Sequence, residues 1–201
     1  MNKPLHLFVG PSASGKTSVA DLLEKYCYRK PYDTEKFFEK HYYKQVKSYT
    51  TRLPRYEGEN NHVFITKEEF DKLENMIAYT EYDDNFYCST AEQLDEADIY
   101  VVDIPGVKTL IENYDTDREI KVWYFSVDVA TRVKRMRSRG DSDTAIVDRI
   151  LTDEQYNWYE ALMTLRDYAM FFVNKHIELN YIDADISLND LVYEMKTRLG
   201  E

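Results

Sequence analysis

The stretch GPSASGKTS, residues 10–18, constrains the fold of this chain more than any other feature. It follows the apolar run LHLFV (5–9) and precedes VADLLEKY, which has helical character. The stretch fits the pattern GxxxxGK[ST], in which glycines let successive backbone N–H groups converge on phosphate oxygens at the start of a helix. Such a turn needs a buried strand before it and a helix after it. The sequence therefore predicts an α/β fold with a phosphate-binding turn after its first strand.

Three further apolar runs have the length and composition of buried strands. They are IYVVDI (99–104), IKVWYFSV (120–127) and YAMFFV (168–173), and helical patterns lie between them. Because short apolar runs alternate with helices, we expect a parallel sheet with both faces covered. Residues 129–139 are one of the expected helices, with Asp128 as its N-cap.

Residues 46–95 depart from this pattern. Short strands and turns predominate there, as in RYEGENNH and YDDN. A chain of 201 residues fits one domain. We therefore expect a single domain, 1–201, in which a small subdomain (about 46–95) is inserted into a core made of residues 1–45 and 96–201.

The glycine-rich stretch supplies the groups that bind a nucleotide phosphate. Lys16 would span the β and γ phosphates, and the Thr17 hydroxyl would ligate Mg²⁺. Asp103, at the end of a predicted strand, is a second candidate magnesium carboxylate and a candidate substrate contact. The alternative is a Gly/Ser turn that caps an ordinary helix. The expected cofactor-binding residues of the loop are Gly10, Ser12, Ala13, Ser14, Gly15, Lys16, Thr17 and Ser18.

The net charge of −11 argues against a nucleic-acid binder held by a broad phosphate-contacting face. Two basic clusters are therefore informative. In RVKRMRSRG, residues 132–140, three arginines share one helical face, where like charges repel, and Arg149 follows on the next helix. In SYTTRLPR, residues 48–55, Arg52 and Arg55 flank a stiffening proline. A solvated basic face and a charged strand edge are the respective alternatives.

Other classes of protein find little support. No run approaches the roughly 18 apolar residues of a membrane span, and the first residues do not resemble a signal peptide. Cys27 and Cys88 have no CxxC spacing and no accompanying histidine pattern. We expect a cytoplasmic protein without a membrane or nucleic-acid partner.

The chain resembles the guanylate kinase family. The similar segments run in order through most of it: GPSASGKTS, SYTTRLPRYEGE, HVFITKEEF, DDNFYCST, VVDIPGV, RVKRMRSRGDSD and FFVN. The resemblance implies a P-loop NTPase core with a parallel β-sheet flanked by helices. It also implies a nucleoside-monophosphate-binding subdomain at about 46–95 and a helical lid at about 135–150. The implied activity is transfer of the γ-phosphoryl group of ATP, with Mg²⁺, to a nucleoside monophosphate.

The resemblance also implies roles for individual residues. Catalysis is expected to need charge neutralisation and positioning more than an acid or a base. The implied catalytic residues are Lys16, Arg52, Arg135, Arg139 and Arg149. The implied monophosphate-binding residues are Ser48, Arg52, Arg55, Tyr87 and Ser89, and Asn174 would lie near the adenine of ATP.

Several positions depart from the family pattern. Ala78 stands where the family has the glutamate that contacts guanine, with Glu81 three residues later as a candidate substitute. Pro105 replaces the second aspartate of the family's DIDxQG segment, and His62 stands where a phosphate-contacting tyrosine is usual. Buried polar groups left unpaired reject a wrong substrate, so these changes predict a relaxed or redirected choice of base.

The leading hypothesis is a nucleoside or deoxynucleoside monophosphate kinase, with GMP or dGMP as the first candidate acceptor. One alternative is a binding module of the same fold that has lost catalysis. Another is a kinase of some other small phosphorylated metabolite. In either kinase case the partners are small molecules, and we expect a monomer or a homodimer.

Overall fold

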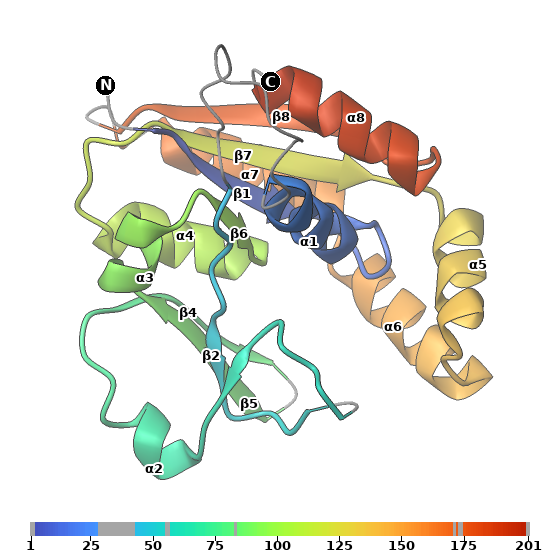
Figure 1. Ribbon diagram of the computed structural model, residues 1–201, viewed down its shortest axis with the longest axis horizontal. Coiled ribbons are helices and arrows are strands. Elements are labelled where there is room, and N and C mark those ends of the chain that lie inside the picture. Colours follow the sequence, from blue (N-terminus) through green and yellow to red (C-terminus); the bar gives the residue numbers. More distant parts are fainter. Residues whose placement is uncertain are drawn as a thin grey trace, which may run out of the picture.

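The computed structural model describes residues 3–27, 43–54, 57–82, 84–170, 172 and 175–199. Its centre is a four-stranded parallel sheet (Figure 1). The strands, in spatial order, are β6 (Ile99–Val101), β1 (Leu5–Val9), β7 (Ile120–Ser126) and β8 (Ile177–Asp183). Every pair is parallel. β1 is central and its neighbours come later in the chain on opposite sides, so the strand order reverses at the carboxyl end of β1. Ligands of open α/β sheets bind at such a point.

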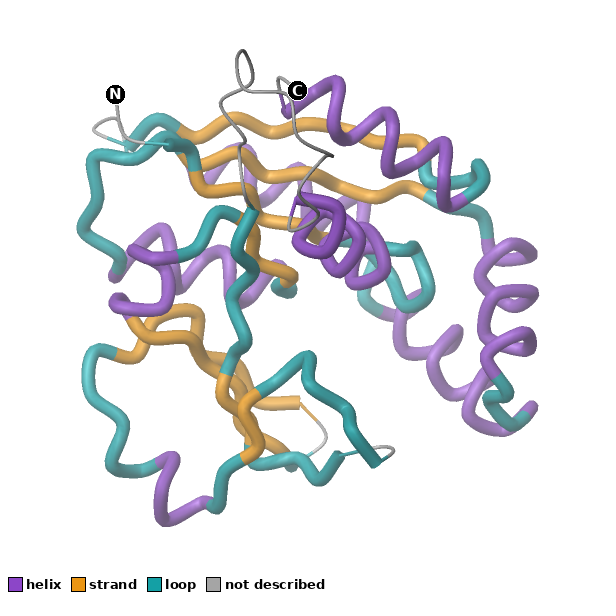
Figure 2. The backbone as a smooth tube through the Cα atoms, viewed as in Figure 1, coloured by secondary structure: helices purple, strands orange, loops and turns teal. Residues whose placement is uncertain are grey.

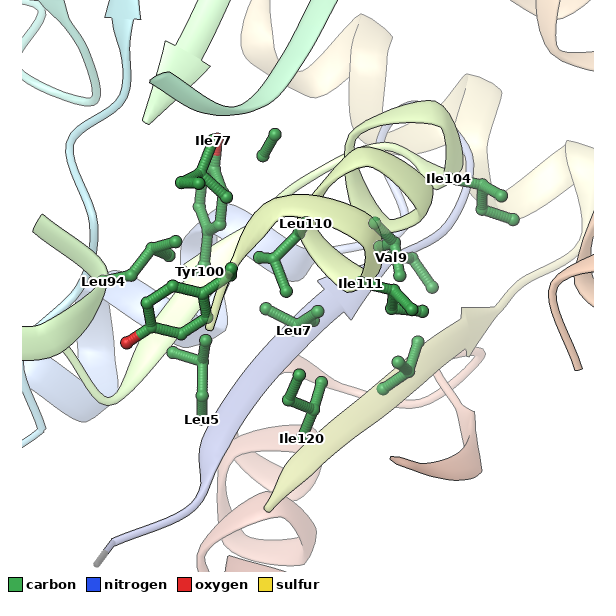
Figure 3. Close-up of a cluster of buried hydrophobic side chains, with 14 of the residues drawn as sticks. Leu5, Leu7, Val9, Ile77, Leu94, Tyr100, Ile104, Leu110, Ile111 and Ile120 are labelled. Carbon is green, nitrogen blue, oxygen red and sulfur yellow. The ribbon is translucent and has the colours of Figure 1, made fainter. Parts of the chain in front are cut away.

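Helices cover both faces of this sheet (Figure 1). α1 (Lys16–Cys27) and α8 (Leu188–Leu199) pack on one face, and α4 (Ile104–Asn113) and α7 (Trp158–Ala169) pack on the other. Successive side chains of β1 point to opposite faces, as in any strand. Leu5, Leu7 and Val9 join the cluster beneath α4, whereas Phe8 joins the cluster beneath α1 and α8 (Figure 3). Both faces are therefore covered, which explains why every residue of β1 except His6 is apolar.

A second, mixed sheet lies between α1 and β6 in the chain. Its order is β3 (Val63–Phe64), β2 (Tyr49–Thr50), β5 (Asn85–Thr90) and β4 (Met76–Tyr82), accompanied by α2 (Lys67–Phe70) and α3 (Ala91–Glu96). β4 packs against α4, and Ile77 joins the apolar cluster of the first sheet (Figure 3). The short strands expected within 46–95 are thus present and anchored to the core.

Two further helices, α5 (Val129–Arg139) and α6 (Asp143–Gln155), form a pair after β7 (Figure 2). The expected helix 129–139 is confirmed, and Asp128 caps it by accepting a hydrogen bond from the Thr131 N–H at 2.6 Å. Gly140 ends α5 in the left-handed conformation (φ +91°), and Ser142 caps α6. The α5–α6 pair and the second sheet project from the same side of the parallel sheet (Figure 1).

The predicted strand at 168–173 is wrong. Tyr168 and Ala169 end α7, and the fourth strand is instead β8, Ile177–Asp183. A short apolar run is compatible with either a buried strand or the inward face of a helix, and the first two residues of this run are helical. The expected strand 99–104 is also shorter, because Ile104 already begins α4. Among the described residues, no helix is long and apolar enough to cross a membrane.

Candidate functional site

The glycine-rich loop joins β1 to α1 at the point where the strand order reverses. Two glycines make its path feasible. Gly10 has φ +145°, and a Cβ there would lie 2.8 Å from the carbonyl oxygen of Phe125; Gly15 has φ +100°. Ala13, at φ +60°, also lies in the left-handed region that side chains disfavour. These positive φ angles allow the loop to turn tightly between the end of β1 and the amino end of α1.

Lys16, the first residue of α1, folds back over this loop. Its Nζ donates to the carbonyl oxygens of Gly10 (2.7 Å) and Pro11 (2.8 Å) and to Ser14 Oγ (3.0 Å). Burial lowers the pKa of Lys16 to about 8, with the charge of Asp153 raising it and that of Arg132 lowering it. A buried ammonium surrounded by neutral acceptors favours an anionic ligand, so the donor set of the loop fits a nucleotide phosphate. Thr17 follows on α1, half-buried, while Ser18 is exposed.

The α5–α6 pair contacts the loop through arginines. Arg132 is 2% exposed, and its Nε donates to the Ser12 carbonyl oxygen at 3.0 Å. Arg135 donates to the carbonyl oxygens of Ala13 and Ser14, each at 3.2 Å. The other arm of Arg135 binds the chain just after β8, at Ala184 O (2.7 Å) and Ile186 O (3.0 Å). Part of the expected basic face is therefore buried against the loop rather than solvated.

Two other arginines, Arg139 and Arg149, both contact Asp141 rather than the loop. Arg139 Nε donates to Asp141 Oδ1 at 3.0 Å, and Arg149 NH1 lies 3.6 Å from Asp141 Oδ2. Asp141 is in the turn between α5 and α6. The structure thus brings Arg139 and Arg149 together, as expected from the sequence, but around a carboxylate of the chain itself.

A cavity of about 160 Å³ lies between the second sheet and the end of β6. It is lined by Ser48, His62, Ala78, Thr80, Tyr87, Tyr100, Val101, Val102 and Asp103. Four of the expected substrate-binding residues are therefore brought together: Ser48, His62, Tyr87 and Asp103. Ser48 Oγ and His62 Nδ1 are hydrogen-bonded at 2.9 Å, and the ring of Tyr87 packs edge-to-face on His62. The lining combines aromatic walls with a few polar groups, which is typical of a small-molecule site.

Asp103 contributes the carboxylate of this cavity. It is the N-cap of α4, where its Oδ1 accepts from the Gly106 N–H at 2.7 Å. Burial raises the pKa of Asp103, although hydrogen bonds from the Gly106 backbone and the Thr80 side chain oppose that shift. The hydrogen bond from the Gly106 N–H holds this carboxylate in a fixed orientation. Asp103 can therefore contact a ligand in the cavity without changing its position.

Of the positions at which the chain departs from the family pattern for the base, Ala78 lines the cavity and Pro105 does not. Ala78 lines it in a left-handed conformation (φ +53°), at an irregularity between Ile77 and Thr80 in the pairing of β4 with β5. Glu81 is exposed and pairs with Phe86 near the hairpin end, so its carboxylate is not among the lining groups. Ser89 is fully buried behind the wall and donates to Ile77 O at 3.3 Å.

Arg52 lies beside the cavity and is paired within the chain. Its guanidinium makes a bidentate pair with Glu59, at 2.8 and 3.2 Å, and lies 5.3 Å from the ring centre of Phe64. Burial works against the charged form, but hydrogen bonds and charge from Glu59 outweigh it, so the pKa of Arg52 is raised. The side chain of Tyr87, a lining residue, also raises the pKa of Arg52. Two expected site residues, Arg55 and Asn174, lie outside the described residues.

Sequence reasoning missed three polar groups at these sites: Asp153 on the loop, Thr80 in the cavity and Glu59 on Arg52. Thr80 carries no motif, and Glu59 ends the segment SYTTRLPRYEGE, in which nothing predicts its pairing with Arg52. Asp153 meets the loop across 141 residues of chain, a contact that only the folded structure defines. The one signal in the sequence was the arginine cluster itself, since a buried arginine needs a carboxylate.

A larger open cavity of about 760 Å³ lies at the opposite end of β6 and holds none of the expected site residues. It is lined by charged and polar groups: Lys3, Glu24, Tyr43, Lys44, Asp95, Glu96, Ala97, Asp98, Thr116 and Arg118. Arg118 donates hydrogen bonds there to four backbone carbonyl oxygens, which gives it a structural role.

No family model matches the chain, and no curated protein matches it significantly.

Proposed function

We propose that this chain is an ATP-dependent nucleoside or deoxynucleoside monophosphate kinase, with GMP or dGMP as the first candidate acceptor. The observation that carries the proposal is the pairing of two sites at one sheet edge. The glycine-rich loop follows β1, and the cavity with Asp103 follows the adjacent strand β6. A donor phosphate at the loop and an acceptor in the cavity would then approach each other at the carboxyl ends of neighbouring strands.

On this proposal the parallel sheet is a P-loop NTPase core, residues 46–95 bind the monophosphate, and the α5–α6 pair acts as the lid. Backbone N–H groups of the loop and Lys16 would bind the ATP phosphates. Lys16 would leave the carbonyl oxygens of Gly10 and Pro11, because an anion is a stronger partner for an ammonium than a neutral acceptor. Thr17 would hold Mg²⁺, which supplies charge neutralisation to the transferred phosphoryl group.

The acceptor would lie in the cavity with its phosphate toward Arg52. Ser48, His62 and Tyr87 offer hydrogen bonds along one wall, and Asp103 offers a carboxylate to a base N–H on the other. Arg52 is charged and adjacent, so exchange of Glu59 for a phosphate would bring the cation to the substrate. Arg139 and Arg149, which share Asp141, would turn to the phosphoryl group in the same way.

The test is ADP release from Mg-ATP, measured with every common ribo- and deoxynucleoside monophosphate. We expect turnover with at least one acceptor, and we expect Lys16→Met to lower kcat by at least about 100-fold because it removes charge from the transition state. Lys25→Met is the matched control, since Lys25 is an exposed lysine of the same helix. Wild-type turnover in Lys16→Met would refute the assignment of the loop.

The acceptor panel also separates the two alternatives. ATP binding without turnover on any nucleoside monophosphate would favour a kinase of another phosphorylated metabolite. Absence of Mg-ATP binding would favour a binding module without catalysis. Turnover with GMP or dGMP alone would mean that groups such as Thr80 and Asp103 replace the glutamate missing at Ala78.

A further inference from the structure

One backbone donor of the glycine-rich loop is bound by a carboxylate from α6. Asp153 Oδ2 accepts a hydrogen bond from the Ser12 N–H at 3.0 Å. The same oxygen is bound by the guanidinium of Arg132. Asp153 is 9% exposed and Arg132 2%, so both charges are buried. These charge-assisted hydrogen bonds join α6 and α5 to the loop at Ser12.

The charges around Asp153 are those that an anionic ligand of the loop would need. Lys16 and Arg132 are the cations whose fields act there, and the charge of Asp153 raises the pKa of Lys16 against burial. Arg132 NH1 lies 3.7 Å from Glu154, a second carboxylate, but the side chain of Glu154 is 61% exposed. Asp153 is therefore the carboxylate that combines burial, a backbone donor of the loop and both cations.

We propose that Asp153 and the phosphate of a nucleotide exclude each other at the glycine-rich loop, so that nucleotide binding releases α6 from Ser12. The inference rests on the proposed ATP site. The Ser12 N–H is a single donor, and a second anion placed against it would be repelled by the carboxylate. Once released, Asp153 leaves Arg132 free to donate to the incoming phosphate, which keeps the buried guanidinium paired.

This exchange couples nucleotide binding to the α5–α6 pair. The carboxylate acts as an internal competitor, so it weakens the apparent affinity of the loop for phosphate. When no nucleotide is bound, the carboxylate also balances the positive charges of Lys16 and Arg132. Two buried cations beside the loop require such a counter-charge. Asp153 is thus a positioning residue: it acts through the loop and α6 rather than on the reacting atoms.

The test measures binding of Mg-ATP and of inorganic tripolyphosphate by calorimetry. The variants are Asp153→Asn, which removes the charge at constant shape, and Glu154→Gln as the matched control. Glu154 lies on the same helix and meets the same guanidinium, but the Ser12 bond belongs to Asp153. We expect Asp153→Asn to bind both ligands tighter by on the order of tenfold, and Glu154→Gln to change affinity by less than about twofold.

Unchanged or weaker binding by Asp153→Asn would overturn the exchange while leaving the ATP site of the wild-type protein intact. Absence of tripolyphosphate and Mg-ATP binding by both proteins would overturn the exchange together with the ATP site. Binding with the expected difference, but without phosphoryl transfer to any acceptor, would support the exchange and refute only the kinase.

Because the substitution leaves Arg132 without its carboxylate, a measurement on the wild-type protein provides an independent test. The side-chain carboxyl carbon of Asp153 can be followed by NMR in protein labelled at aspartate while tripolyphosphate is added. Loss of two hydrogen bonds should move this resonance in step with saturation of the site. A resonance that stays in place at saturation would overturn the exchange.

Discussion

His6 is a buried histidine whose protonation should control acid stability. Its Nδ1 accepts a hydrogen bond from the Trp123 indole N–H at 3.1 Å. Burial, together with the positive charges of Lys121 and Arg118, lowers the pKa of His6 to about 4. The folded state therefore prefers the neutral imidazole. Its contribution is complete above pH 6.5 and is lost as the pH falls toward 4, because the unfolded chain takes up the proton first.

We predict that this one group removes roughly 3 kcal/mol from the free energy of unfolding between pH 7 and pH 4. The measurement is urea unfolding of wild type and of His6→Asn, whose amide oxygen can still accept from the indole. Carboxylates titrate in both proteins, so the difference between the two pH profiles isolates His6. Parallel profiles would show that the imidazole is not held neutral.

Asp103, the N-cap of α4, lines the candidate acceptor cavity, and Gly106 in the first turn of α4 packs tightly against it. A Cβ at Gly106 would lie 2.6 Å from Val102 Cγ2 and 2.8 Å from Asp103 Oδ1. Alanine is normally better than glycine in a helix by about 1 kcal/mol. Here the steric clash should outweigh the gain in helix propensity, because overpacking costs about 1–3 kcal/mol and the Asp103 cap is disturbed as well.

We therefore predict that Gly106→Ala lowers the free energy of unfolding by about 1–2 kcal/mol and raises the KM for the acceptor with little change in the KM for ATP. Lys108→Ala is the control, since Lys108 lies on the same helix and outside the lining of the cavity. Chemical unfolding and steady-state kinetics on both variants supply the comparison. A Gly106→Ala protein that is more stable than wild type would contradict the tight contact.

Among the structural elements, those that are marked by local sequence signals could be predicted. The loop at 10–18 was predictable because glycines, strand and helix occur together in the chain, and α5 because Asp128 caps it. β8 was missed because it is an edge strand with one strand neighbour, and its apolar residues are interrupted by Glu178, Asn180 and Asp183. The Asp153 contact was missed for a different reason: it depends on how α6 folds back onto the loop.

The whole molecule presents two projecting parts that differ in how they are held. The second sheet is anchored through apolar packing of β4 on α4, whereas the α5–α6 pair is held to the loop by Arg132, Arg135 and Asp153. Polar contacts to a ligand-binding loop are exchangeable, but an apolar core is not. If the chain is a kinase, the α5–α6 pair should therefore be the part that moves most when both substrates bind.

We predict that a non-hydrolysable Mg-ATP analogue together with the acceptor lowers the radius of gyration measured by small-angle X-ray scattering. The change should be on the order of 1 Å, against about 17 Å for a compact chain of this length. The analogue alone should produce part of it, because displacement of Asp153 already frees α6. Lys16→Met with the same ligands is the control, since it should bind the triphosphate poorly and remain open. Scattering that is unchanged at saturation in a protein that turns over would mean that water is excluded without movement of α5 and α6.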